Sequence, residues 1–183
     1  MLKNLLEKRR AYRSLKPLEV TDELINDLAA CAGLAPSCYN NQPWRYVFVY
    51  EEEALKKLQG ALPKANGWAK KASLLVAVFS RKDFDCLVKE REYYLFDTGT
   101  ATGFMILRAT EMGLVAHPMA GFDEEKAKEA LNIPADMKVI TLIAIGKYSE
   151  EIDHDLPEKM VEIEKKRPER KKVEEFVYKN NFS

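Results

Sequence analysis

The sequence predicts one globular domain of mixed helices and strands, followed by a charged arm. Its 183 residues are 46% hydrophobic and 32% charged, enough to bury a substantial core. Helical segments with apolar faces are interspersed with short runs of β-branched and aromatic residues. Beyond Gly146 most residues are charged, so we divide the chain into a domain at 1–149 and an arm at 150–183.

The helices are predicted from apolar periodicity and capping residues. Residues 2–13 form an amphipathic pattern in which the leucine face continues into Arg9 and Arg13. A second helix begins at Thr21, a side-chain N-cap, and ends at Gly33, a common C-terminal stop. Further helices are expected at residues 51–59, 93–113 and 123–131. The longest of these is apolar nearly all round, so we expect it to be buried.

Four short apolar runs predict strands at residues 46–50, 74–79, within 114–119, and at 139–145. The run at 74–79 has no polar position and is predicted to be the central strand. The arm is too charged to form its own core. Apolar residues near its end, from Val173 to Phe182, indicate that it docks on another surface, such as a second subunit. A solvated tail is the alternative.

Composition excludes several classes of partner. The chain has 29 basic and 29 acidic residues, so no net field attracts nucleic acid or an anionic membrane. No apolar run reaches the length of a membrane span, and the first residues do not resemble a signal peptide. Three cysteines without zinc-site spacing and two histidines predict no metal site. We expect a cytoplasmic protein.

Two segments carry the polar groups that could bind a ligand. Residues 36–44 crowd two prolines, two asparagines, a serine and a glutamine before Trp44, more than a plain turn requires, which favours a ligand-binding loop. Residues 9–13 hold three arginines, whose planar donors suit a phosphate. The alternative for the arginines is the solvated basic end of a helix.

Together with a third segment, these residues resemble the nitroreductase family of FMN-dependent oxidoreductases. The family's Arg-Arg-Ser-x-Arg pattern is represented by residues 9–13, with Ala11 in place of serine. Its Pro-Ser-x-x-Asn-x-Gln-Pro-Trp loop is intact at 36–44, and Gly-Leu leading to Pro-x-x-Gly-Phe-Asp stands at 113–123. The order and spacing match from residue 5 to about 147, and the arm with Arg170 matches the family's C-terminal extension.

The resemblance implies an α+β nitroreductase-like fold, a mostly antiparallel sheet flanked by helices, in an intertwined homodimer that binds FMN at its interface. It also implies the cofactor-binding residues Arg9, Arg10, Arg13, Pro36, Ser37, Cys38, Asn40, Asn66, Pro118, Met119, Ala120, Gly121, Arg170 and Lys172. By the same resemblance, the first two arginines and the arm contact phosphate and ribityl oxygens. Arg13 reaches the N1/O2 edge of the ring, and residues 36–40 come from the other subunit.

The implied activity is ping-pong hydride transfer from NADH or NADPH through flavin N5 to an oxidised acceptor such as a nitroaromatic or quinone. The flavin carries the chemistry, so no protein residue is predicted to be catalytic. An FMN-binding sensor or carrier without turnover is the alternative, and a phosphate-binding or interaction module without flavin is a third. Because no Gly-x-Gly-x-x-Gly fingerprint is present, the nicotinamide donor rests on the resemblance alone.

Several residues depart from the family pattern or are interpreted as structural. Ala120 stands where nitro-reducing members carry an acid, and the segment that forms their helical lid, between Gln59 and Gly113, is shorter. Cys38 replaces a common serine and is interpreted as a small packing residue, in preference to a redox thiol. His117 is interpreted as structural, and Asp97 as a hydrogen-bonding partner for a backbone group or another residue, in preference to a proton donor. Both tryptophans, Trp44 and Trp68, are expected to be core or interface anchors.

Overall fold

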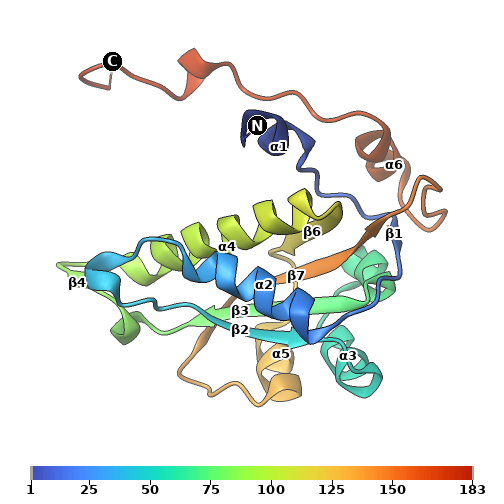
Figure 1. Ribbon diagram of the computed structural model, residues 1–183, viewed down its shortest axis with the longest axis horizontal. Coiled ribbons are helices and arrows are strands. Elements are labelled where there is room, and N and C mark those ends of the chain that lie inside the picture. The colour runs from blue at the N-terminus through green and yellow to red at the C-terminus, as the bar shows by residue number, and fades with distance from the viewer. Residues whose placement is uncertain (1, 183) are drawn as a thin grey trace.

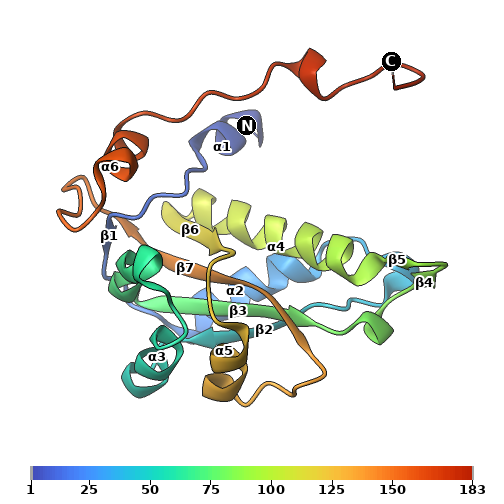
Figure 2. The same cartoon turned by 180° about the vertical axis from the view of Figure 1, so that it is seen from behind.

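A computed structural model describes residues 2–182 and shows a sheet with helices on both faces (Figures 1 and 2). The sheet consists of β1 (Leu15–Lys16), β2 (Arg45–Val49), β3 (Leu74–Ser80), β6 (Leu114–Met119) and β7 (Lys138–Tyr148). The long strand β7 pairs with β3 and β6, and β1 pairs with its last two residues. All of these pairings are antiparallel, as is that of β2 with β3, which confirms the predicted α+β class.

Two pairs of helices cover the two faces of the sheet. Figures 1 and 2 show α2 (Asp22–Gly33) and α4 (Tyr93–Glu111) on one side, and α3 (Glu52–Gln59) and α5 (Glu124–Leu131) on the other. Thr21 caps α2 as predicted, since its side chain accepts a hydrogen bond from the amide of Leu24. A small hairpin of β4 (Leu87–Val88) and β5 (Arg91–Glu92) extends from the end of the sheet before α4.

Alternation along β3 divides the core into two hydrophobic clusters. Leu74, Val76 and Val78 face the cluster under α2 and α4, whereas Leu75 and Ala77 face the cluster under α3 and α5. Both sets are at most 1% exposed, which confirms β3 as a strand buried on both faces. Trp44 and Trp68 each belong to one of these clusters, as predicted.

Helix α4 is buried on one face only. Residues such as Ala101, Met105 and Ala109 are fully buried, but Phe96 is 67% exposed and Phe104 is 39% exposed. The expectation of burial all round was therefore wrong for the isolated chain. The exposed aromatic side chains leave an apolar face of α4 that this chain does not cover.

The first helix is shorter than predicted. Helix α1 covers Leu2–Lys8, and Arg9 to Arg13 lie in an irregular segment that leads to β1, so these arginines do not extend a helical face. The reason lies outside the local sequence: the amides of Arg13 and Ser14 donate to the carboxylate of Glu164 instead of to helix carbonyls. Tertiary hydrogen bonds override the helical pattern here.

After β7 the chain leaves the sheet as an arm. Helix α6 (Glu158–Lys165) packs near the root of this arm, and the chain then runs back past α1 in extended form (Figures 1 and 2). Short 3₁₀ turns lie at Cys38–Asn40, Lys64–Lys71, Lys82–Phe84 and Val173–Glu175. Within residues 2–182, no helix has the length and apolar character needed to cross a bilayer.

Candidate functional site

Arginines from two distant segments line one pocket beneath the arm. The pocket measures about 150 Å³ and is lined by Arg9, Arg10, Arg13, Arg167 and Arg170, together with Ala11, Ile163 and Pro168. No Asp or Glu among the described residues lines it. A small concave site with several guanidinium groups and no lining carboxylate suits a phosphate or another compact anion.

Electrostatics of this pocket are unfavourable without an anion. Burial lowers the pKa of Arg9, and the positive charges of Arg167, Arg170 and Arg10 lower it further. Arg10 and Arg167 use their guanidinium groups to bind backbone carbonyls, which ties the arm to the segment after α1. The guanidinium groups of Arg9 and Arg170 have no hydrogen-bond or ion-pair partner among residues 2–182, so both are available to a ligand.

Arg13 presents an unused donor at the inner end of the same site. Its guanidinium carbon lies 5.8 Å from the centroid of the Trp68 ring, and its Nη1 atom is buried without a hydrogen-bond partner in the described chain. Burial lowers the pKa of Arg13, and Glu164 opposes that shift. A buried guanidinium nitrogen without a protein partner is costly, so this donor is available to a ligand.

A chain of contacts connects Arg13 with the segment 118–121. The Trp68 indole stacks on His117 with ring centroids 4.5 Å apart and donates through Nε1 to Oδ1 of Asn66, at 3.3 Å. Asn66 in turn donates through Nδ2 to the carbonyl of Gly121, at 2.7 Å. A Cβ at position 121 would lie 3.0 Å from this Nδ2 atom, so a larger residue there would force the Asn66 side chain to shift. The predicted residues Asn66 and Gly121 are thus brought together.

His117 has a structural role, as predicted. Its Nδ1 lies 3.0 Å from the carbonyl oxygen of Tyr12, and the ring is 8% exposed. Burial lowers the pKa of His117 to about 4, and the charges of Arg13 and Arg9 add to that effect. At neutral pH the imidazole is therefore uncharged and donates its Nδ1 proton to Tyr12, which holds the backbone just before Arg13.

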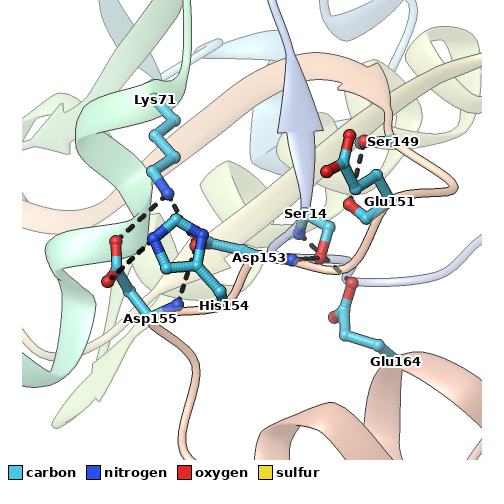
Figure 3. Close-up of polar contacts among 8 residues, drawn as sticks. All are labelled: Ser14, Lys71, Ser149, Glu151, Asp153, His154, Asp155 and Glu164. Carbon is cyan, nitrogen blue, oxygen red and sulfur yellow. Dashed lines mark hydrogen bonds and ion pairs between the residues drawn. The ribbon is translucent and has the colours of Figure 1, made fainter.

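Polar contacts at the root of the arm hold the arginine segment in place (Figure 3). Asp153 donates its amide to Oγ of Ser14 at 3.0 Å, and its carboxylate forms an ion pair with Lys71 at 2.6 Å. Glu164, only 3% exposed, accepts from the amide of Ser14 at 3.2 Å. These bonds fix the segment before β1 to the arm and to the turn that carries Trp68.

The loop at 36–44 lies at the opposite end of the molecule. Figures 1 and 2 place the β4 hairpin, to which this loop is joined, far from α6 and β1, where the arginines gather. Tyr39, Asn40 and Gln42 all have positive φ, and Oγ of Ser37 accepts from the amide of Gln42 at 2.9 Å. Asn40 and Pro36 are exposed. One chain therefore does not bring its own loop to its own arginine pocket.

The remaining predicted cofactor-binding residues differ in whether their side chains can reach a ligand. Pro118 and Ala120 are exposed beside Gly121, but the side chain of Met119 is 3% exposed and packs in the core, so only its backbone can face a ligand. Lys172 is exposed on the arm beyond the pocket. Arg167 lines the pocket and was not predicted; its signal in the sequence was the Arg-Pro-Glu-Arg run that ends at Arg170.

Cys38 was interpreted as a packing residue, and this was wrong. Its sulfur forms a disulfide with Cys86, 48 residues later, and only Cys31 is a free thiol within the described chain. The spacing gave no signal because the two cysteines meet only after the loop and the β4 hairpin fold together. Asp97 meets expectation, since its carboxylate accepts the Cys38 amide at 2.7 Å.

Comparison with known proteins defines the class to which this fold and site belong. The model of the Nitroreductase family matches residues 6–147, and the chain belongs to that family. Among curated relatives, "Putative NAD(P)H nitroreductase MhqN" of Bacillus subtilis is 27% identical over 208 residues, covering 93% of this chain and 94% of that protein. An Archaeoglobus fulgidus relative, "Putative NADH dehydrogenase/NAD(P)H nitroreductase", is 28% identical and covers 79% and 84% of the two chains.

Solved structures have the same fold. An oxidoreductase described as containing FMN aligns with a TM-score of 0.85 and 28% identity, covering 98% of this chain and 91% of that one. A Bacillus subtilis nitroreductase-family structure aligns with a TM-score of 0.79 and 25% identity, covering 97% of both chains. These likenesses confirm the nitroreductase fold that the sequence motifs predicted.

Proposed function

We propose that this protein is an FMN-dependent oxidoreductase that takes hydride from NADH or NADPH and passes the electrons to an oxidised acceptor such as a nitroaromatic or quinone. The observation that carries the proposal is the buried, unpartnered Nη1 of Arg13 beside an arginine-lined pocket. FMN has the two features this site requires, a phosphate and a polar ring edge that becomes negative on reduction. The FMN-containing structural relative supports the same cofactor.

Different arginines would contact different parts of the cofactor. Arg9, Arg167 and Arg170 would hold the phosphate, because they line a small pocket whose lining includes no carboxylate. Arg10 keeps its backbone contacts with the arm and adds positive charge. Bound FMN would supply reversible two-electron chemistry with hydride transfer at N5.

Arg13 would stabilise negative charge on the reduced ring. A guanidinium that is fixed over Trp68 needs no reorganisation when this charge develops, so it favours the reduced state. Asn66 and backbone groups of 118–121 would line the ring on the same side, held by the bond from Asn66 to Gly121. The chain needs no nucleophile or general base for this role.

A second copy of the chain would complete the site. The predicted loop and the arginine pocket lie at opposite ends of one chain, so a homodimer can place Ser37 and Asn40 of the partner subunit against the arginines. The exposed apolar face of α4 and the apolar end of the arm supply surfaces for such an interface. The root of the arm is bound to its own chain, so we propose that the apolar end of the arm, from Val173 to Phe182, docks on the partner.

The electron donor is inferred from the relatives, and the kind of acceptor from the surface beside Gly121. The curated relatives carry NAD(P)H nitroreductase names, which supports a nicotinamide donor that shares one open cavity with the acceptor in turn. Ala120 is exposed and offers no charged group, so acceptors are expected to be selected by size and apolar contact.

A carrier or sensor that binds FMN without turnover is the second candidate. It is favoured by the short segment between Gln59 and Gly113, which includes the β4–β5 hairpin and for which the family resemblance implies a reduced lid. Anaerobic mixing of the FMN-loaded protein with NADH or NADPH separates the two functions. Bleaching of the flavin absorbance, followed by recovery on adding a quinone, supports the oxidoreductase; flavin that stays oxidised supports the carrier.

The cofactor itself is tested by purification and reconstitution. The protein is expected to be yellow, or to bind added FMN with quenching of flavin fluorescence, at one FMN per chain. Substituting Arg13→Gln should weaken that binding, whereas Lys57→Gln, an exposed change on α3, should not. A folded protein that refuses FMN would leave the phosphate-binding or interaction module as the remaining interpretation.

A further inference from the structure

One disulfide joins the predicted cofactor loop to the β4 hairpin. Cys38 lies at the start of the 3₁₀ turn in the loop, and Cys86 directly precedes β4. Both residues are partly exposed, so a small thiol can approach them. Neither belongs to the two hydrophobic clusters of the domain, so opening this bond does not require the core to open.

Two buried carboxyl groups lie beside the disulfide. Asp97 accepts the amide of Cys38 at 2.7 Å, and Asp85 accepts the amide of Cys86 at 2.8 Å. An oxygen of Asp85 lies within 4.8 Å of both sulfurs, and its Oδ2 is buried without a partner in the described chain. Burial raises the pKa of Asp97, and neighbouring Asp85 raises it further against the Cys38 amide. Two buried carboxyl groups thus lie next to the sulfurs, in a site separate from the arginine pocket.

Asn41 distinguishes one sulfur from the other. Its Nδ2 donates to Oδ1 of Asp85 at 3.3 Å and to Sγ of Cys86 at 3.6 Å. An N–H group directed at Cys86 stabilises that sulfur when it carries negative charge. Cys86 is therefore the better leaving sulfur, and Cys38 is the one that an external thiolate attacks.

We propose that Cys38 and Cys86 form a reversible dithiol–disulfide site that exchanges with low-molecular-weight thiols such as glutathione. One glutathione thiolate attacks Sγ of Cys38, the Cys38–Cys86 bond breaks, and Cys86 leaves as a thiolate that takes a proton. A second glutathione thiolate attacks the glutathione sulfur of the mixed disulfide and releases Cys38, which is protonated in turn. Two glutathione molecules are oxidised to one disulfide, and the protein gains two electrons and two protons.

Reduction of the disulfide would weaken the attachment of the β4–β5 hairpin to the predicted cofactor loop. In the disulfide form the segment before β4 is covalently tied to the loop, whereas in the dithiol form Asn41 supplies the remaining hydrogen bond between them. Leu87, which follows Cys86 at the base of this hairpin, is 66% exposed, so the tether positions an apolar surface next to the predicted cofactor loop. The chemistry of the site does not require bound FMN.

The test is an equilibrium with mixtures of reduced and oxidised glutathione, quenched by alkylation and read by peptide mass spectrometry. We expect Cys38 and Cys86 to gain two thiols together as the ratio rises, while far-ultraviolet circular dichroism shows that the fold persists. Cys31→Ser serves as the matched control, since it removes the unpaired thiol only. A pair that stays oxidised, or stays reduced, at every ratio in the folded protein would overturn the proposal.

A rate measurement tests the role of Asn41 as a positioning residue. Asn41→Leu removes the N–H group with little change in size and should slow reduction by glutathione by about threefold to tenfold, the loss of one hydrogen bond. Asn41→Gln keeps an amide and should recover part of the rate. If both variants react at the wild-type rate with an unchanged fold, Cys86 is not selected as the leaving sulfur in this way.

Discussion

The carboxylate of Glu164 on α6 accepts a hydrogen bond of 2.9 Å from the amide of Arg13, which lies 151 residues earlier in the chain. The same carboxylate, 3% exposed, also binds the amide of Ser14. One buried side chain of the arm thus fixes the backbone position of an arginine in the candidate site. The arm is part of the site's architecture for this reason.

Glu164→Gln is expected to destabilise the protein by about 1–3 kcal/mol, because one amide then loses a charged acceptor in a buried position. Urea unfolding followed by circular dichroism measures the loss. Glu162→Gln is the matched control, since Glu162 is exposed on the same helix. Equal stability of the two variants would show that the buried carboxylate does not hold the arm.

Replacing arginines in the pocket should weaken FMN binding without unfolding the domain. Arg9→Ala removes a guanidinium that has no protein partner, and Arg13→Ala removes the unpartnered buried donor. Each change should raise the dissociation constant for FMN by about 10- to 100-fold, the worth of a hydrogen bond to a charged group. Fluorescence titration gives the constant. Stoichiometric FMN in both purified variants would contradict the assignment of this pocket.

His117 should make the stability of the FMN-free protein depend on pH. Burial lowers the pKa of His117 in the folded protein to about 4 from 6.5. Between pH 4 and 6.5, therefore, the unfolded chain binds a proton at this residue and the folded chain does not. The contribution of the neutral imidazole to the free energy of unfolding is therefore complete above pH 6.5. It is lost as the pH falls toward 4, by about 3 kcal/mol in total. His117→Gln cannot bind this proton and should show a flatter pH profile in urea unfolding. If the stability of the wild-type protein and of His117→Gln changed with pH in the same way, His117 would not be the group responsible.

Local signals predicted much of the fold. Thr21 and Gly33 delimit α2 through capping chemistry that lies within a few residues, and the apolar run of β3 predicts a central strand by itself. The motif order at 9–13, 36–44 and 113–123 predicted the family, which the family model confirms. These features need no knowledge of contacts distant in the chain.

Features set by distant contacts could not be predicted. The backbone of Arg13 and Ser14 is held by Glu164 of the arm, and the pairing of Cys38 with Cys86 depends on the packing of two loops. Arg167 reaches the pocket only because the arm returns over the N-terminal segment. The predicted roles of Ser37 and Asn40 depend on a second chain and remain predictions.

The apolar end of the arm is expected to be required for a homodimer. Val173 is 62% exposed, Phe176 58% and Phe182 84%, and a segment with so few apolar residues among charges does not fold on itself. A chain that ends after Lys172 keeps Glu164 and Arg170 but loses these side chains, so it should remain folded while its dimer dissociates at least tenfold more readily. Light scattering over a dilution series measures this dissociation, and Lys179→Ala in the full chain controls for altered charge. A truncated chain that stays dimeric at the same concentrations as the full chain would show that the interface lies elsewhere, with the exposed face of α4 and its Phe96 and Phe104 as the next surface to substitute.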